Sequence, residues 1–257
     1  MLARILAIAA ALAAIGAATW YFWPRDLPPP PPPSQAAAPA APPKAEGPLH
    51  PVEAVPEQPL PPLKESDPAL LEGLARLLGS AALQKFFDLE GIVFDIVATV
   101  DNLPRESYAT RMNPVKPIGG AFQASGYEAT LAISSANAAR YAAFVQMAEA
   151  VNSAQAVAMY RRFYPLFQQA YVALGYPNGY FNDRLVEVID HLLATPDVQG
   201  AIPLTVPHVL YEFADPELEQ RSSGQKALLR MGRDNALRLK AKLRELRGEL
   251  LAVEPRR

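Results

Sequence analysis

Three polar side chains of one predicted helix have the types and the spacing that metal sites use. Asp183, Glu187 and His191 stand four residues apart, so a helix over residues 180–194 places them on one face. Carboxylates and imidazole are ligands of zinc and other transition metals, although a further ligand, such as His208, would have to come from elsewhere in the chain. The same residues also fit the polar face of an amphipathic helix, and we favour this structural interpretation.

A second possible chemistry uses carboxylates as acid and base. Glu187 paired with Glu212 or Asp215, with His191 nearby, would suit a hydrolase acting on the cell wall, but the sequence does not give the distance between the carboxylates. The chain contains no nucleophile elbow, phosphate-binding loop, dinucleotide fingerprint or zincin helix. It also contains no cysteine, which excludes thiol catalysis and cysteine-bound metals. We therefore favour a non-catalytic protein without a cofactor.

The predicted helix 180–194 follows a longer helix, 153–174, that has an aromatic face. Its rings recur with helical periodicity, and each aromatic side chain buries roughly 150–250 Å², so we expect this stripe to form the core. Gly175 and Pro177 end the helix, which predicts an antiparallel helical hairpin at the centre of the fold. The alternative is a groove for a peptide or a glycan. The candidate interaction residues of this hairpin are Tyr160, Arg161, Tyr164, Tyr171 and Arg184.

The rest of the folded part, residues 63–257, also predicts helices. We therefore expect an all-α domain of about seven helices around the aromatic hairpin. Pro165 lies inside the aromatic helix and is expected to kink or break it. Residues 122–131 are compatible with a short β-hairpin, and the apolar residues of segment 206–213 are expected to dock onto the core. The further helices are predicted at 68–79, 81–89, 91–100, 135–151, 225–231 and 233–253.

The last predicted helix carries leucines at heptad spacing. Such a seam packs against another helix, and we expect that helix to belong to the same domain. Homodimerisation or a partner helix is the alternative, and contact of the basic outer face with an acidic polymer or lipid is a weaker one. The seam residues that would form a homodimer are Leu239, Leu243, Leu246 and Leu250.

The N-terminal region predicts a membrane anchor followed by a linker. Residues 5–23 carry no charge and would span about 28 Å as a helix, which is close to the hydrocarbon thickness of a bilayer. We interpret residues 1–23 as an uncleaved signal anchor, with a cleavable signal peptide as the rival interpretation. Residues 24–62 contain 16 of the 27 prolines, which is typical of an extended, disordered linker.

Several stretches resemble one known family. They include ATVDNLP (98–104), YRRFYPLFQQAYVALGYPNGYFNDRLVEVIDHLLATPDV (160–198) and YEFADPELE (211–219). On these strings the chain resembles a proteobacterial domain-of-unknown-function family, number three thousand and fourteen. The resemblance implies a membrane anchor, a proline-rich linker and a helical domain, and it brings no established activity or catalytic residue.

Together these features predict a bacterial inner-membrane protein with a single span and a periplasmic C-terminal domain. The formal net charge of −2 gives no basic excess for nucleic acid, so we expect none as a partner. The predicted role is an interaction or scaffold module that binds an envelope protein or a cell-wall component. The alternatives are the hydrolase described above and a sensor that binds a small ligand between helices.

Overall fold

A computed structural model of the chain describes residues 47–52, 59–106 and 112–252. These residues belong to the second of two compact units, Glu46–Arg257. The predicted membrane segment, residues 5–23, and most of the predicted linker lie outside the described residues. Among the described residues, no helix combines the length and the apolar composition that a membrane span requires.

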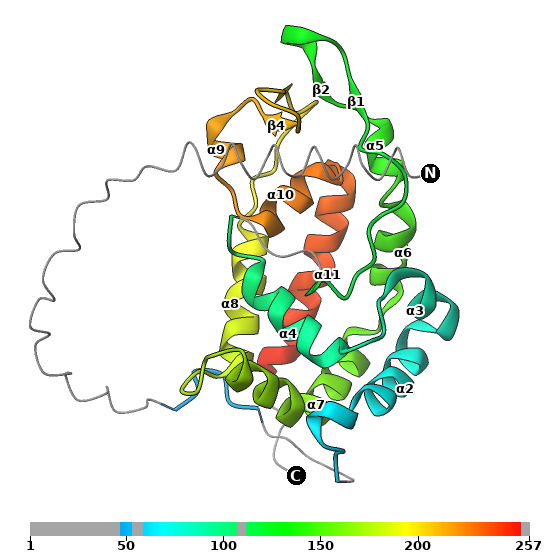
Figure 1. Cartoon of the computed structure of the whole chain (residues 1–257), viewed down its shortest axis with the longest axis vertical. Helices are drawn as coiled ribbons and strands as arrows, with labels where there is room; N and C mark the ends of the chain where they lie inside the picture. Colours follow the sequence, from blue (N-terminus) through cyan, green and yellow to red (C-terminus); the bar gives the residue numbers. More distant parts are fainter. Residues whose placement is uncertain (1–46, 53–58, 107–111, 253–257) are drawn as a thin grey trace, which may run out of the picture. The chain divides into compact units, whose positions relative to one another are not determined.

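Helices dominate the described residues, which confirms the predicted all-α class (Figure 1). They form ten α-helices and two short 3₁₀ helices, η1 (Leu63–Glu65) and η3 (Glu128–Thr130). The number exceeds the predicted seven partly because the helix predicted at 135–151 is divided into α5 and α6. The helix α9 has four residues, too few to show a helical period in the sequence. The α-helices are α2 (Asp67–Leu78), α3 (Ser80–Phe86), α4 (Ile92–Asn102), α5 (Ala136–Ala139), α6 (Ala142–Ala150), α7 (Ser153–Ala173), α8 (Phe181–Leu193), α9 (Pro216–Glu219), α10 (Ser223–Arg230) and α11 (Arg233–Leu251).

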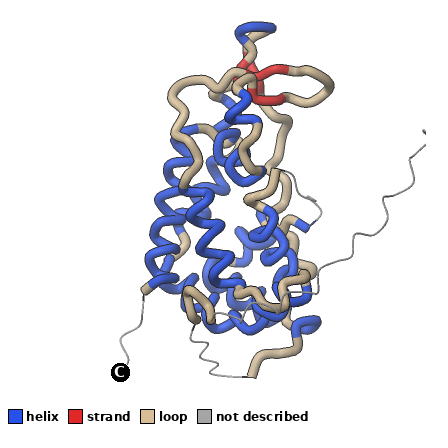
Figure 2. Tube along the Cα trace, turned by 90° about the vertical axis from the view of Figure 1, so that its left-hand side faces the viewer, coloured by secondary structure: helices blue, strands red, loops and turns tan. Residues whose placement is uncertain are grey.

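Two small hairpins lie together at one end of this unit (Figure 2). In the first, β1 (Ala124–Ser125) pairs antiparallel with β2 (Ala132–Ile133), and in the second β3 (Leu204–Thr205) pairs antiparallel with β4 (Glu212–Phe213). An isolated bridge between Ala132 and Pro203 joins the two pairs.

A hairpin forms near the predicted place, but the predicted pairing of 122–124 with 127–131 is wrong, because most of the expected second strand forms the turn. Instead of turning at Ser125-Gly126, the chain turns through η3, so that Ser125 pairs with Ala132. Gly126 has a φ of +86°, and a Cβ at this position would approach the main-chain oxygen of Thr130 to 2.2 Å. Only glycine fits there without a shift of the backbone.

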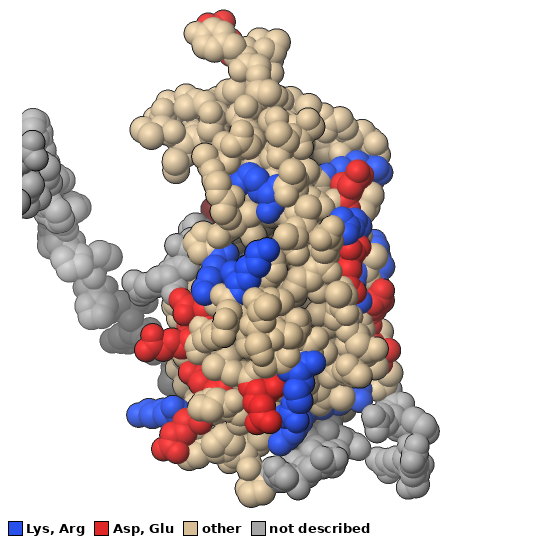
Figure 3. All heavy atoms as spheres, turned by 90° about the vertical axis from the view of Figure 1, so that its right-hand side faces the viewer, with Lys and Arg blue, Asp and Glu red and all other residues tan. Residues whose placement is uncertain are grey.

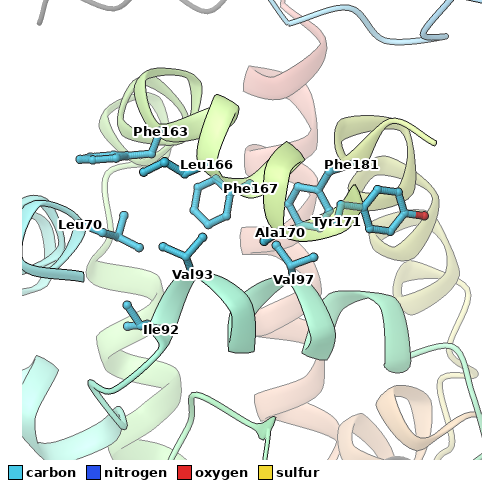
Figure 4. Close-up of a cluster of buried hydrophobic side chains, with 10 residues drawn as sticks. All are labelled: Leu70, Ile92, Val93, Val97, Phe163, Leu166, Phe167, Ala170, Tyr171 and Phe181. Atoms are coloured by element: carbon cyan, nitrogen blue, oxygen red, sulfur yellow. The ribbon is translucent and has the colours of Figure 1, made fainter. Parts of the chain in front are cut away.

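The main core forms where α7 crosses α4. The aromatic stripe predicted for α7 is confirmed, because Phe163, Phe167 and Tyr171 are buried in this cluster and the ring of Phe167 lies over Val93 of α4 (Figure 4). The buried residues of this cluster are Leu70, Ile92, Val93, Val97, Phe163, Leu166, Phe167, Ala170, Tyr171 and Phe181.

The predicted antiparallel pairing of α7 with α8 is wrong in its geometry. The helix α7 contacts α4 and α11 more extensively than it contacts α8, and it lies across the lower end of the unit in Figure 1 while α8 runs upward. The aromatic stripe of α7 is broad and packs against the apolar face of α4, so α8 is not its main partner. Moreover, α7 continues as one helix from Ser153 to Ala173, so Pro165 does not break it.

The last helix packs within its own chain. It contacts α6, α7, α8 and α10, and its leucine seam is half-buried in these contacts. This packing agrees with the favoured interpretation of the heptad pattern. Homodimerisation through Leu239, Leu243, Leu246 and Leu250 stays a prediction.

The segment between α8 and α9 departs from its predicted packing. Of its apolar residues expected to dock onto the core, only Phe213 is buried. Val209 and Leu210 are 88% and 76% exposed. They lie in the connection between the paired strands β3 and β4.

Candidate functional site

The first predicted site residue, Asp183, binds a segment of the proline-rich region. Its carboxylate accepts hydrogen bonds from the backbone N–H groups of Leu49, at 3.0 Å, and His50, at 2.7 Å. The neighbouring Asn182 side chain donates to the main-chain oxygen of His50 at 2.8 Å and accepts from the Tyr160 hydroxyl at 3.1 Å. Asp183 lies in the first turn of α8, and both of its carboxylate oxygens accept hydrogen bonds from backbone N–H groups of segment 49–50.

The second candidate, Glu187, belongs to a network centred on Asp101 of α4. Asp101 is 2% exposed, and its carboxylate accepts from Arg184 Nε at 3.0 Å, from Arg105 Nη2 at 2.6 Å and from the Tyr176 hydroxyl at 3.0 Å. The guanidinium of Arg184 also donates to the main-chain oxygen of Asp101 at 2.8 Å and to the exposed carboxylate of Glu187 at 2.9 Å. We call these five residues the Asp101 network.

The Asp101 network has no net formal charge, because two guanidinium groups balance two carboxylates. It joins three parts of the fold: the end of α4, the turn between α7 and α8, and the polar face of α8. Burial, followed by the negative charge of Asp101, raises the pKa of Tyr171 to about 12, so that this phenol stays protonated. A neutral hydrogen-bonded network around a buried carboxylate of this kind stabilises a fold.

The third candidate, His191, holds α10 against α8. Its Nε2 lies 2.8 Å from the Ser222 hydroxyl, and its main-chain oxygen accepts from Gln225 Nε2 at 2.9 Å. Burial, followed by the positive charge of Arg184, lowers the pKa of His191. Gly224 permits this close packing, because a Cβ at its position would come within 2.7 Å of the Leu192 side chain.

The three predicted metal ligands therefore have three separate sets of partners. In residues 47–52, 59–106 and 112–252, no group of three or more His, Asp and Glu side chains is placed to hold a metal ion. Glu212 lies in β4 opposite Thr205, and no hydrogen bond or ion pair joins it to Glu187 or His191 among these residues. Catalytic carboxylate pairs stand about 5–10 Å apart and share no hydrogen bond, so the pairing of Glu187 with Glu212 stays a prediction.

The predicted interaction residues of α7 also serve the fold. Tyr171 is a core residue and stacks on Tyr176, while the ring of Tyr160 packs against aromatic neighbours in α7 and α8. The Tyr164 hydroxyl donates to the Gln168 side chain at 3.1 Å. Arg161 donates to the main-chain oxygens of Glu249, at 3.1 Å, and Ala252, at 2.9 Å, at the C-terminal end of α11. Arg184 belongs to the Asp101 network.

The surface feature that sequence reasoning missed lies on the two hairpins. Seven large apolar side chains are exposed among the described residues, and two of them, Leu49 and Val172, lie outside the hairpins. The other five we call the hairpin surface. They are Tyr127 (77% exposed), Val206 (44%), Val209 (88%), Leu210 (76%) and Tyr211 (42%).

The surroundings of the hairpin surface are almost free of charge. Segments 117–139 and 198–211 contain one charged residue, Glu128. Figure 3 shows the same contrast on one face, where the hairpin end carries acidic atoms only at its tip and the helices below carry many charges of both signs. This uncharged run was the available signal in the sequence, because exposed loops of soluble domains are usually rich in charge.

A core of their own supports the hairpins. Ile202, Leu204 and Phe213 are buried there with residues of α9 and α10. The rings of Phe122 and Tyr211 lie 5.4 Å apart and join the two hairpins. The exposed residues are thus presented on a packed base.

Comparison with known proteins places the chain in a family. A family model described as "Protein of unknown function (DUF3014)" matches residues 92–247, which is more than half of the chain. The chain belongs to this family. No curated protein and no solved structure matches it.

The DUF3014 match confirms the resemblance found in the sequence. It begins at the first residue of α4 and ends within α11. The Asp101 network, both hairpins and the hairpin surface therefore lie inside the DUF3014 region, while α2 and α3 lie outside it.

Proposed function

We propose that this DUF3014 protein is a non-catalytic binding module whose hairpin surface docks an envelope protein. The single observation that carries this proposal is that five of the seven exposed large apolar side chains of the described residues lie on two packed hairpins. In this proposal residues 5–23 anchor the chain in the bacterial inner membrane, and the domain acts in the periplasm. The anchoring rests on the apolar N-terminal sequence.

The chemistry of the hairpin surface favours a protein partner with an uncharged apolar patch. The cores of protein interfaces are depleted of charge and enriched in aromatic side chains, and the hairpin surface combines Tyr127 and Tyr211 with three aliphatic residues. A charged polymer such as nucleic acid would find no matching charge there. A tether would add to a weak contact of this kind, because it raises the effective concentration of the domain near other membrane proteins.

The test compares the hairpin surface with an exposed apolar position elsewhere. A photo-crosslinking amino acid is placed at Val209 of the full chain in bacterial cells, and at Val172 of α7 as the matched control. We expect one defined protein to crosslink from position 209 and not from position 172. The purified partner should then bind the full chain directly, and V209D/L210D should weaken this binding about tenfold or more, while V172D should leave it unchanged.

Two outcomes would overturn the proposal. Equal crosslinking from positions 209 and 172 would show that the hairpin surface has no specific partner. Crosslinking from position 209 to lipid alone would assign the surface to a membrane contact. Circular dichroism of V209D/L210D should match that of the unaltered chain, because both side chains are exposed and contribute little to the core.

A further inference from the structure

A pocket of about 360 Å³ lies beside the first half of α11. Its walls come from β2 and α5, from segment 195–202, from the end of α10 and from α11. The volume is in the range of small-molecule sites. Most of the lining is apolar and includes Ile133, Val198, Ile202, Leu228, Leu229 and Leu237.

One buried cation, Lys240, belongs to this lining. Its side chain is on the first half of α11, and the residue is 7% exposed. The ammonium donates one hydrogen bond, to the main-chain oxygen of Thr195 at 2.7 Å. An ammonium group has three donors, so this contact uses one of them. Thr195 lines the same pocket, which places the Lys240–Thr195 contact in the pocket wall.

Neither acidic residue that lines the pocket, Asp197 or Asp234, forms an ion pair with Lys240. Asp197 is held by Arg233 in a bidentate ion pair, with both N–O distances at 2.7 Å. Asp234 is exposed in the first turn of α11, where its charge acts on Arg233 and Arg238. Among the described residues, Lys240 therefore has no carboxylate within ion-pair distance.

The electrostatics of Lys240 follow from this arrangement. Burial, followed by the positive charge of Arg244, lowers the pKa of Lys240, and the negative charge of Asp197 acts in the opposite direction. A buried charge is costly unless an opposite charge and further hydrogen bonds compensate it. An anion in the pocket would supply both.

We propose that this pocket binds a small monocarboxylate with an apolar body, whose carboxylate accepts hydrogen bonds from Lys240. A single unpaired cation matches one negative charge, and the aliphatic lining matches a hydrocarbon chain. The site is separate from the hairpin surface, and this inference does not depend on the proposed docking of a partner.

The test uses octanoate as the probe, with octanol as the matched uncharged ligand. Binding of each to the full chain is measured by calorimetry, and chemical-shift changes locate the site. We expect octanoate to bind at least about tenfold more tightly than octanol, because an ammonium–carboxylate contact is a charge-assisted hydrogen bond. K240M should reduce octanoate affinity about tenfold or more, K240R should restore most of it, and R247M, which removes a charge on the same helix outside the pocket, should leave it unchanged.

Three results would overturn the proposal. Octanol binding as tightly as octanoate would show that Lys240 does not select the ligand. Absence of octanoate binding by the folded, unaltered chain would show that the pocket is not a site for this class of ligand. Equal losses in K240M and R247M would show that the overall charge of the protein governs binding. The comparison of octanoate with octanol needs no variant, so it decides the matter even if K240M does not fold.

Discussion

Asp101 and Lys240 are both more than nine-tenths buried, but the charges around them differ. The carboxylate of Asp101 accepts hydrogen bonds from two guanidinium groups and a phenol. The ammonium of Lys240 is hydrogen-bonded to one carbonyl oxygen. The fold thus compensates one buried charge fully and leaves the other with donors that nothing in the described residues uses.

The difference in charge compensation suggests different roles: Asp101 stabilises the fold, whereas Lys240 is suited to bind a ligand. Burying a charge carries a large desolvation cost, which good ion-pair geometry offsets. The Asp101 network meets this requirement with residues of the chain itself, at the meeting point of α4 and α8. Lys240 does not meet it, although a methionine of similar length would fill the same space without the cost. A ligand that brings an opposite charge gives this position a reason to be lysine.

The largest expected effect tests the first half of this comparison. D101N removes the negative charge that Arg105 and Arg184 share, and it should lower the free energy of unfolding by about 3 kcal/mol or more, because a buried charge then loses its partner. Urea denaturation followed by circular dichroism measures this change. The matched control is E187Q at the exposed end of the network, for which we expect a change within about 1 kcal/mol. Equal effects of the two variants would contradict a central role for Asp101.

A smaller effect tests the second half. K240M removes a buried cation that lacks a carboxylate partner and retains the apolar part of the side chain. The loss of the hydrogen bond to Thr195 opposes the gain from removing the desolvation cost, so the free energy of unfolding should stay within about 1 kcal/mol of the unaltered chain. The same urea titration measures it. A loss as large as that of D101N would show that Lys240 is part of the architecture.

Most helices could be predicted because their signals are local. The apolar period of residues 91–100 and 180–194 predicted α4 and α8 nearly to their observed ends, Ile92–Asn102 and Phe181–Leu193. The packing of these helices could not be predicted in the same way. The aromatic stripe of α7 specifies a broad apolar partner, but several predicted helices offer one, and the choice of α4 depends on the whole core.

The candidate site was harder to predict from the sequence than the helices, because its features depend on contacts between segments that are distant in the chain. Asp183, Glu187 and His191 have the spacing of metal ligands, yet each side chain is directed to a different partner. From the sequence alone, Lys240 is expected to belong to the basic outer face of the last helix. It is buried because segment 195–202, more than 35 residues away in sequence, covers it. The exposure of Val209 and Leu210 likewise follows from the pairing of β3 with β4.

The smallest effect concerns His191, which lies beside the Asp101 network. Burial and the charge of Arg184 lower its pKa below the ordinary value of 6.5, so the folded state binds a proton less readily than the unfolded state. The stability that His191 contributes is therefore present above pH 6.5 and is lost as the pH falls from 6.5 through the folded-state pKa. H191Q should flatten the decrease in melting temperature between pH 7 and pH 5. An NMR titration that places the pKa of His191 above 6.5 would contradict this prediction, and it would indicate that the exposed carboxylate of Glu187 outweighs burial and Arg184 at this position.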